Sequence, residues 1–448
     1  MDKGILREYD IRGVVDEDIT EDVAYELGKS YGTLMVRRKA KHVAVGRDGR
    51  LSSERLESAV IEGIVATGIN VTDIGLCPSP VLYFSLFNLD VDGGVIVTAS
   101  HNPPEFNGFK VCVGKSTIFG KEIQELGIIA DSGEFEQGNG TVTSHDMVAD
   151  YKRYLEENIR ISKPLKVAVD GGNGTAGFIA APVMRALGCE VKEFYCEVDG
   201  TFPNHHPDPT LPENLADLIA EVTGSDTPIG MAYDGDGDRL GVIDERGGII
   251  WGDRLMIIFS RELLKEHPGA TIIGEVKCSQ YLYDDIERHG GRGLMWKTGH
   301  SLIKSKMKET GALLAGEMSG HLFFADRYFG YDDAIYASLR LLEILAHTGK
   351  SPRELLADVP KSSITPEIRV DCPDEKKEGI VESVREFFRS KHEVNDVDGA
   401  RIKFTHGWGL VRASNTQPVL VLRFEADSDE HLEEIKSLVE SKVAEFSK

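Results

Sequence analysis

Three stretches of the chain repeat one order of apolar and polar positions. Each begins with a short run rich in Val, Ile and Ala, continues through a polar turn into a segment with helical spacing, and reaches a Gly before a second apolar run. A β-branched run before a polar turn predicts a strand, and Gly after a helical segment predicts the end of that helix. The pattern therefore predicts three related α/β units. The first run and turn of each unit occupy 41–50, 165–177 and 270–280.

The last ninety or so residues follow another pattern. Apolar runs within 367–373, 400–414 and 418–426 predict strands, and 429–446 has the spacing of an amphipathic helix. A chain of 448 residues exceeds one hydrophobic core, so we expect several domains. The predicted fold is three similar mixed-sheet α/β domains and a smaller C-terminal α+β domain around a central cleft. The expected domains are 1–145, 146–248, 249–358 and 359–448.

Composition narrows the possible partners. The net charge of −23 repels polyanions, so we expect no nucleic-acid partner. No apolar run is long enough for a membrane span, and the charged N-terminal residues lack the apolar core of a secretory signal. The six cysteines are scattered and predict buried thiols. We expect a cytoplasmic protein in which any anionic ligand is held by local cations or by a metal ion.

The segment 93–111 contains the first candidate for chemistry. The apolar run 95–97 predicts an interior strand, and Ser100 follows at its carboxyl end, where open α/β sheets bind ligands. Two prolines then restrict the backbone. His101 beside the serine and Lys110 downstream offer a proton carrier and a countercharge for phosphate. An ordinary Asn-Pro turn, with Ser100 as a local hydrogen-bonding residue, is an alternative that this pattern leaves open.

Three aspartates alternate with glycines in a second motif. Asp234, Asp236 and Asp238 can aim three carboxylates at one hard cation such as Mg²⁺, and Arg239 is placed for a phosphate contact beside it. An EF-hand is excluded, although Glu245 stands at its twelfth position, because Arg239 replaces the required Gly. A solvated acidic turn remains the alternative.

Two polar clusters nearer the C-terminus predict ligand contacts. One alternates with glycines and suits the adjacent hydroxyls of a sugar, and the other places one guanidinium and three neutral donors before a strand, as a phosphate clamp would. A plain turn is the alternative for each. The first cluster is Glu317, Ser319 and His321, and the second is Arg412, Ser414, Asn415 and Thr416.

Two glycine patterns raise the question of nucleotide binding. Gly172, Gly174 and Gly177 form a G-x-G-x-x-G between a predicted strand and helix, so an NAD-dependent dehydrogenase is an alternative function, against a close strand-helix packing turn. The Gly-Lys-Ser at 28–30 lacks the first P-loop glycine, because Val23 stands there, and predicts no ATP site.

Taken together, the motifs "EYDIRG", "TASHNPPEFNGFK", "DGDGDR", "GEMSGH" and "RASNTQP" resemble those of the α-D-phosphohexomutase superfamily, in its phosphomannomutase/phosphoglucomutase branch. The resemblance spans essentially the whole chain. It implies a reversible phosphoryl transfer between the 1- and 6-phosphates of mannose or glucose, through a phosphoserine and a hexose 1,6-bisphosphate. It also gives the glycine motif a structural role.

The resemblance further implies a phosphorylated Ser100 and one Mg²⁺ per chain, held by Ser100 and the three aspartates. The residues it assigns to catalysis are Ser100, His101, Lys110, Arg12 and Arg239, with His101 or Lys110 moving the proton. The residues it assigns to substrate binding are Lys277, His300, Glu317, Ser319, His321, Arg412, Ser414, Asn415 and Thr416. The expected partners are phosphorylated hexoses, with hexose 1,6-bisphosphate as activator, in a monomer or homodimer.

Alternatives within the same chemistry concern the sugar and the fate of the phosphoryl group. The phosphoglucosamine mutase branch has Gln in place of Met318 and a different phosphate loop, so the motifs favour mannose and glucose. A phosphatase that hydrolyses the phosphoserine, or an inactive sugar-phosphate binder, is less favoured because all the reactive residues are present.

Overall fold

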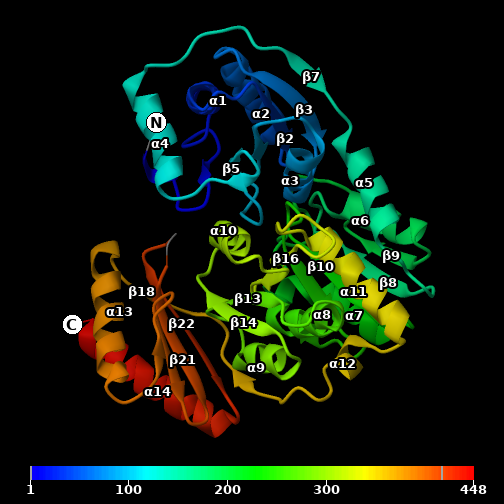
Figure 1. Ribbon diagram of the computed structural model, residues 1–448, viewed down its shortest axis with the longest axis vertical. Coiled ribbons are helices and arrows are strands. Elements are labelled where there is room, and N and C mark those ends of the chain that lie inside the picture. The colour runs from blue at the N-terminus through cyan, green and yellow to red at the C-terminus, as the bar shows by residue number, and fades with distance from the viewer. Residues whose placement is uncertain (1–2, 415–416, 448) are drawn as a thin grey trace.

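The computed structural model describes residues 3–414 and 417–447, and the chain forms four regions, each built on its own sheet (Figure 1). The first three regions combine parallel and antiparallel strands with helices. The fourth has an antiparallel sheet with two long helices. The predicted fold class is confirmed.

The first region has the strand order β1-β5-β4-β2-β3-β7, with β6 paired to β5. Alternate residues of one strand face different cores, since Val43 and Val45 pack with α1 and α2, whereas Ala44 packs on the side of α3. The strands are β1 (Ile11–Val14), β2 (His42–Arg47), β3 (Asn70–Leu76), β4 (Gly93–Val97), β5 (Phe106–Val113), β6 (Ser116–Thr117) and β7 (Val142–Ser144). The helices are the short 3-10 turn Lys3–Ile5, α1 (Glu21–Arg37), α2 (Ser53–Val65), α3 (Ser79–Asn88) and α4 (Lys121–Ser132).

The second and third regions are smaller versions of this plan, with strand orders β12-β11-β10-β8-β9 and β14-β13-β15-β16. The second contains α5 (Met147–Asn158), β8 (Lys166–Asp170), α6 (Gly177–Ala186), β9 (Glu190–Phe194), the 3-10 turn Pro212–Leu215, α7 (Ala216–Gly224), β10 (Gly230–Tyr233), β11 (Leu240–Ile243) and β12 (Ile249–Ile250). The third contains α8 (Gly252–Glu266), β13 (Thr271–Glu275), α9 (Gln280–Arg288), β14 (Arg292–Trp296), α10 (His300–Thr310), β15 (Leu314–Gly316), β16 (Leu322–Phe324), α11 (Ala334–Thr348) and α12 (Pro352–Leu355).

The three sequence repeats form equivalent structures. In each, a helix connects two strands that pair directly and in parallel with each other. The pairs are β2 with β3, β8 with β9 and β13 with β14. The predicted repeat is therefore confirmed. Its consequence is that the polar turn after each first strand lies at the carboxyl end of a sheet, where ligands bind in open α/β folds.

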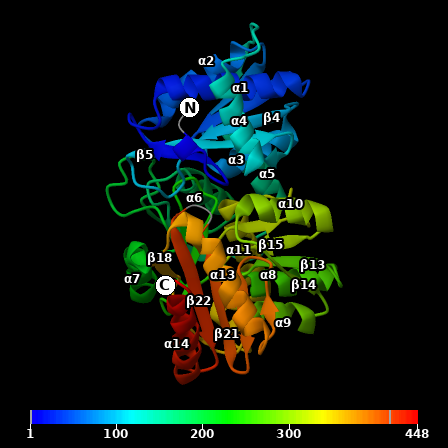
Figure 2. The same cartoon turned by 90° about the vertical axis from the view of Figure 1, so that its left-hand side faces the viewer.

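The fourth region has the order β17-β22-β21-β20-β19, with β18 also paired to β22. Its strands are β17 (Ser363–Ile364), β18 (Ile368–Asp371), β19 (Val394–Asn395), β20 (Ala400–Phe404), β21 (Gly407–Ala413) and β22 (Val419–Ala426), and its helices are α13 (Asp374–Arg389) and α14 (Asp429–Phe446). Figure 2 shows this sheet beside the third region and below the first.

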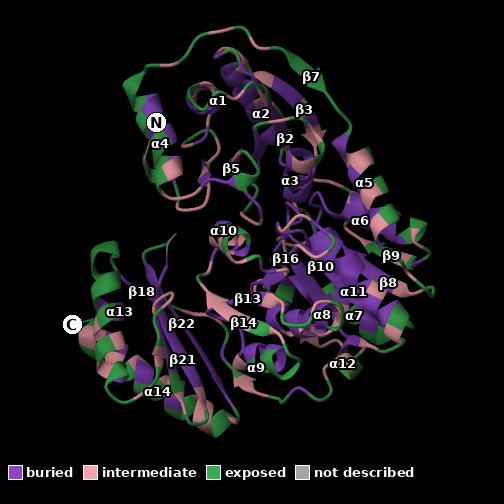
Figure 3. Cartoon of the chain, in the orientation of Figure 1, coloured by how far each residue is buried: buried purple, intermediate pink, exposed green. Residues whose placement is uncertain are grey.

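Buried residues lie in all four regions (Figure 3), and the apolar ones among them divide into several cores. The largest joins the second and third regions and includes α3 of the first, whereas the fourth region has a core of its own. A small cluster of Val276, Trp408 and Leu410 links that fourth core to the third region. The six cysteines are free and buried, as predicted. Among the described residues, no helix combines the length and apolar character needed to cross a membrane.

Candidate active site

Ser100 lies in the loop of residues 98–105 that follows β4, here called the Ser100 loop. The residue is 3% exposed, and its φ of +51° falls in the left-handed region that residues other than Gly rarely adopt. Its Oγ donates a hydrogen bond to Asp234 Oδ2 at 2.9 Å and lies 3.1 Å from His101 Nδ1. The structure thus joins the end of β4 to the aspartate motif across 134 residues of sequence.

One arginine fixes the Ser100 loop. The side chain of Arg50 is fully buried, and its two terminal nitrogens donate to four carbonyl oxygens, those of Ser100, Asn102, Pro103 and Phe106, at 2.6–3.0 Å. Its Nε donates to Asp48 at 3.2 Å, which balances the buried charge. These bonds hold a strained backbone whose left-handed φ costs on the order of 1–3 kcal/mol.

The aspartate motif follows β10 in a tight loop, residues 234–239, here called the aspartate loop. Asp234, Asp236 and Asp238 are at most 1% exposed, and one oxygen from each lies within 4.8 Å of the others. Asp234 Oδ1 accepts from the backbone amides of Asp238 and Arg239, which fixes the wrap of the loop. The alternative of a solvated acidic turn is wrong, because these carboxylates are buried.

Lys110 on β5 balances part of this negative charge. Its Nζ donates to Asp236 Oδ2 and to Asp238 Oδ2, both at 2.6 Å. Burial would lower the pKa of Lys110, but the two aspartates raise it above its usual value. Burial, with the neighbouring aspartates, raises the pKa of Asp234 well above its usual range. At Asp238, Lys110, His321 and Arg239 together outweigh burial and lower the pKa.

The site fits a hard divalent cation. Within the described part of the chain, Asp236 Oδ1 and Asp238 Oδ1 are buried without a hydrogen-bond partner, and buried charged oxygens of that kind are costly. Three convergent carboxylates and a hydroxyl are the oxygen ligands that Mg²⁺ prefers.

The glycine motif braces the aspartate loop. A Cβ on Gly174 would lie 2.6 Å from the carbonyl oxygen of Gly235, and a Cβ on Gly235 would lie 2.4 Å from that of Ser100. Thr175 donates to Gly235 O through both its amide and its hydroxyl, at 3.0 and 3.1 Å. The glycines of residues 171–177 therefore allow three backbone segments to approach closely, which is the packing interpretation of the motif.

Two histidines form the next layer. His321 stacks on His300 with ring centroids 5.7 Å apart, and its Nε2 lies 3.0 Å from Arg239 Nε. Asp332 faces both imidazoles, with Oδ2 3.2 Å from His321 Nδ1 and 3.4 Å from His300 Nδ1. Burial lowers the pKa of His300. At His321, Asp238, Asp332 and Glu317 together outweigh burial and raise the pKa. Lys304 also pairs with Asp332, at 2.9 Å.

Two cations predicted to belong to the site, one catalytic and one substrate-binding, are paired with carboxylates. Arg12 on β1 donates to Asn102 of the Ser100 loop at 2.7 Å and also pairs with Asp10. Lys277, in the turn after β13, lies 3.2 Å from Glu367 and 3.6 Å from Glu275. These pairs limit the cost of burying cations in a protein of net charge −23.

The predicted sugar-binding cluster lies in the turn between β15 and β16. Glu317 is buried, and its Oε1 accepts from the Gly299 amide at 2.7 Å. Its other oxygen lies 4.0 Å from His321 Nε2, so these two residues come together. Ser319 is partly exposed in the same turn.

The predicted phosphate clamp is at the end of β21. Arg412 is buried and its Nε donates to Asp398 at 3.0 Å, while the same carboxylate accepts from the Thr298 amide in the third region. The Ser414 hydroxyl accepts from the Gln417 amide at 3.2 Å. Asn415 and Thr416 lie outside the described residues. A cavity of about 610 Å³ lies next to this loop, lined by residues of the first region and by Lys377, Gln417 and Pro418 of the fourth.

The sequence interpretation missed three positioning residues. Arg50 lies in the polar turn after the first strand of a repeat. A long charged side chain at that place was the only sequence feature that could have pointed to it. Asp332 and Asp398 carried no such signal, because each acts only through partners that are distant in sequence.

Comparison with known proteins matches the four regions to four known domains in the same order. Residues 3–136, 149–248 and 251–362 match phosphoglucomutase/phosphomannomutase alpha/beta/alpha domains I, II and III, and residues 367–442 match the C-terminal domain of that family. A phosphomannomutase/phosphoglucomutase of Pseudomonas aeruginosa is 48% identical over 97% of this chain and 94% of its own. A phosphoglucomutase of Neisseria meningitidis is 44% identical over 98% and 97%.

A solved structure of a phosphoglucomutase/phosphomannomutase family protein from Burkholderia thailandensis superposes with a TM-score of 0.95. It is 43% identical and covers all of this chain and 98% of its own. With matches to all four domains in order and relatives of this identity over nearly its whole length, the chain belongs to the phosphoglucomutase/phosphomannomutase family.

Proposed function

We propose that the protein interconverts the 1- and 6-phosphates of mannose and glucose, with Ser100 as the phosphoryl carrier. The observation that carries the proposal is the buried contact between Ser100 Oγ and Asp234 at 2.9 Å, beside two further aspartates and Lys110. An ordinary turn would not explain why three buried carboxylates and a buried ammonium group surround this serine. The names of the relatives support the same substrates.

In the first half-reaction, phosphoserine gives its phosphoryl group to the free hydroxyl of a hexose monophosphate. The bond from phosphorus to Oγ breaks as a bond to the sugar oxygen forms, the sugar hydroxyl loses its proton, and Oγ gains one. The hexose 1,6-bisphosphate then turns around and returns its other phosphoryl group to Ser100. When bound to Ser100 and the three aspartates, Mg²⁺ would neutralise part of the phosphate charge during transfer.

The contacts of His101 and Lys110 separate their proposed roles. His101 Nδ1 lies 3.1 Å from Ser100 Oγ and is within reach of the proton that this oxygen gains or loses. The ammonium of Lys110 is already bonded to two carboxylates at 2.6 Å. This supports His101 as the proton carrier at Ser100 and Lys110 as a fixed positive charge, with Arg12 and Arg239 adding further charge.

The remaining groups would bind the sugar phosphate in both orientations. Glu317, Ser319 and His321 are proposed for the hydroxyls, with Lys277 and His300 lining the same space. Arg412 and Ser414, with Asn415 and Thr416, are proposed for the phosphate that is not reacting. The proposed domains are 1–145, 146–248, 249–358 and 359–448. In chain order they contribute the Ser100 loop, the aspartate loop, the sugar-binding turn and the phosphate clamp.

Intact mass and turnover test the proposal together. After treatment with hexose 1,6-bisphosphate and Mg²⁺, we expect one added phosphoryl group in the wild type and none in Ser100→Ala, which also loses turnover of glucose 1-phosphate and mannose 1-phosphate. Ser58→Ala, at an exposed position on α2, is the matched control and keeps both. Turnover of glucosamine phosphates alone would indicate phosphoglucosamine mutase, and steady release of inorganic phosphate would indicate a phosphatase.

A further inference from the structure

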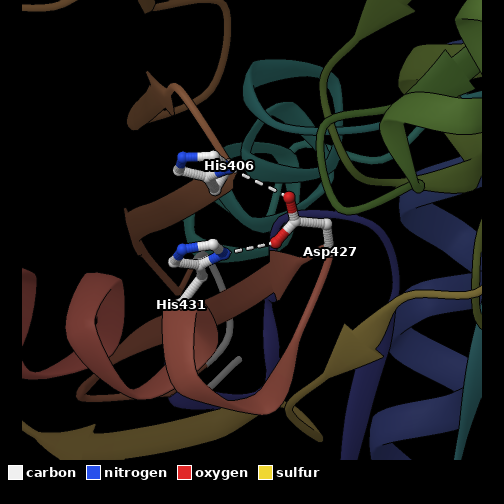
Figure 4. Close-up of side chains that lie close together, drawn as sticks. All are labelled: His406, Asp427 and His431. Atoms are coloured by element: carbon white, nitrogen blue, oxygen red, sulfur yellow. Dashed lines mark hydrogen bonds and ion pairs between the residues drawn. The ribbon is translucent and has the colours of Figure 1, made fainter.

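Two histidines and an aspartate gather at the end of the fourth region that is opposite the phosphate clamp. His406 lies in the turn between β20 and β21, Asp427 follows β22, and His431 lies in the first turn of α14 (Figure 4). Ser414 follows the other end of β21, a strand of seven residues, so the cluster is about 20 Å from the clamp. The cluster takes no part in the proposed mutase chemistry.

The backbone holds these three residues in place. The Asp427 amide donates to the carbonyl oxygen of His406 at 3.0 Å, continuing the pairing of β21 with β22. The Ser428 hydroxyl caps α14 by accepting from the His431 amide at 3.3 Å. Asp427 stands just before the N-cap of α14 and His431 lies in the first turn of that helix, so the start of the helix brings the two side chains together.

Both imidazoles turn the same nitrogen toward one carboxylate (Figure 4). His406 Nδ1 lies 3.0 Å from Asp427 Oδ2, and His431 Nδ1 lies 2.5 Å from Asp427 Oδ1. The rings stack with centroids 3.9 Å apart and planes within 12°. One candidate ligand atom from each residue lies within 4.8 Å of the other two. Small rotations of these exposed side chains would bring the three atoms onto one ion.

The possible metal ligands of this cluster differ in kind from those of the aspartate loop. Two imidazole nitrogens and one carboxylate oxygen suit a borderline transition-metal ion, whereas the aspartate loop offers only oxygens. We propose that His406, Asp427 and His431 form a second metal site, for an ion of the Zn²⁺ class, that ties the β20–β21 turn to the start of α14. Three protein ligands on an open surface leave the remaining coordination positions to water.

The surroundings favour a cation. Glu430 and Glu434, on the same helix as His431, add negative charge close to it. The side chains of His406, Asp427 and His431 are 49%, 47% and 32% exposed, so an ion has direct access. The six thiols, which would otherwise compete for Zn²⁺, are all buried.

Metal binding at Nδ1 replaces the bond to hydrogen there. An imidazolium releases that proton to the solvent, and a neutral imidazole keeps its single proton on Nε2. A metal that binds the folded site stabilises the fourth region by mass action. The effect is structural and does not require turnover, so it can be measured apart from the proposed mutase activity.

Calorimetric titration of the metal-stripped full chain with Zn²⁺, in excess Mg²⁺ to occupy the aspartate loop, tests the site. We expect one Zn²⁺ to bind the wild type and the affinity to fall at least about tenfold in His431→Asn, His406→Asn and Asp427→Asn. We also expect Zn²⁺ to raise the melting temperature of the wild type but not of these variants. Co²⁺ should give ligand-field absorption that is lost with the same substitutions.

His145→Asn is the matched control, because His145 pairs with a single carboxylate, that of Asp150, at 2.6 Å. It should bind Zn²⁺ as the wild type does. Melting in a chelator shows that each variant is folded. Absence of Zn²⁺ uptake by the wild type, or equal uptake by the wild type and His431→Asn, would overturn the proposal and leave a hydrogen-bonded histidine pair.

Discussion

The turns after β2 and β8 occupy equivalent places in two repeats, yet they support the active site by opposite means. After β2, the long charged side chain of Arg50 reaches four carbonyl oxygens in and beside the Ser100 loop. After β8, the absence of a side chain at Gly174 lets the backbone touch the aspartate loop at Gly235. Both turns therefore position a neighbouring loop, one by a buried ion and the other by close packing.

The third equivalent turn, after β13, faces the fourth region instead. Ser279 donates to Glu425 at 2.7 Å, and Arg401 donates to the carbonyl oxygens of Val276 and Cys278. The equivalent turns of the three repeats thus contact three different parts of the protein, namely the Ser100 loop, the aspartate loop and the fourth region. The comparison teaches that the fold supplies the location of each turn, whereas its side chains decide what the turn holds.

The largest effect is expected from Arg50→Met. Removing the guanidinium leaves the buried Asp48 without its ion-pair partner and frees the carbonyls of the Ser100 loop, which should lower the free energy of unfolding by about 3–5 kcal/mol. Misplacement of Ser100 should lower kcat by about a hundredfold. Urea unfolding and steady-state kinetics measure the two effects.

Arg55→Met is the control for Arg50→Met, since Arg55, in the first turn of α2, forms more exposed ion pairs with Asp16 and Glu21. Its loss should change stability by about 1 kcal/mol or less. Equal effects of the two substitutions would show that the four carbonyl contacts of Arg50 contribute little.

Gly174→Ala tests the packed turn. The added Cβ would meet the carbonyl oxygen and Cα of Gly235 at 2.6 and 2.8 Å, so backbone has to move, and we expect a loss of about 1–3 kcal/mol together with lower kcat. Gly224→Ala is the matched control, because a Cβ there meets nothing within 4 Å. A Gly174→Ala protein as stable and active as Gly224→Ala would contradict the packing role.

Per pH unit, the smallest expected effect is a change in the pH dependence of stability. Burial, reinforced by Asp73, raises the pKa of Glu57 from 4.5 to about 8, although Arg47, at the end of β2, pairs with it at 3.0 Å. Glu54 adds a weaker increase. The folded protein therefore keeps a proton that the unfolded chain releases. This contribution to stability is complete below about pH 4.5 and is lost as the pH rises through about 8.

Glu57→Gln should remove this dependence. Between pH 5 and 8, wild-type stability should fall relative to the variant by at most about 1.4 kcal/mol per pH unit. Urea unfolding at several pH values measures it, with the exposed Glu62→Gln as control. Gly174→Ala should shift the wild-type curve without changing its slope, because glycine packing involves no proton. Parallel curves for the wild type and Glu57→Gln would contradict the assignment.

Much of the fold followed from local pattern. Apolar runs, helical spacing and Gly at helix ends predicted the three repeats, because strand and helix periodicities are properties of neighbouring residues. The grouping of Asp234, Asp236 and Asp238 was also visible, since glycines between them allow only a tight wrap. Whether Ser100 ended an ordinary turn stayed open at that level.

Contacts between loops needed the folded chain. Ser100 lies 134 residues from Asp234, and Arg50 lies fifty from Ser100, so neither pairing leaves a periodic trace. The role of Gly174 was likewise ambiguous, because a glycine between a strand and a helix suits both a nucleotide phosphate and a close backbone contact.

The sequence by itself determined the repeated α/β units, the acidic loop and the positions of the reactive side chains along the strands. Only the tertiary structure decided which turn supports which loop, and which cations are paired with which carboxylates. The physical reason is that secondary structure depends on short-range spacing, whereas a buried charge or a missing Cβ acquires its meaning from whatever distant segment packs against it.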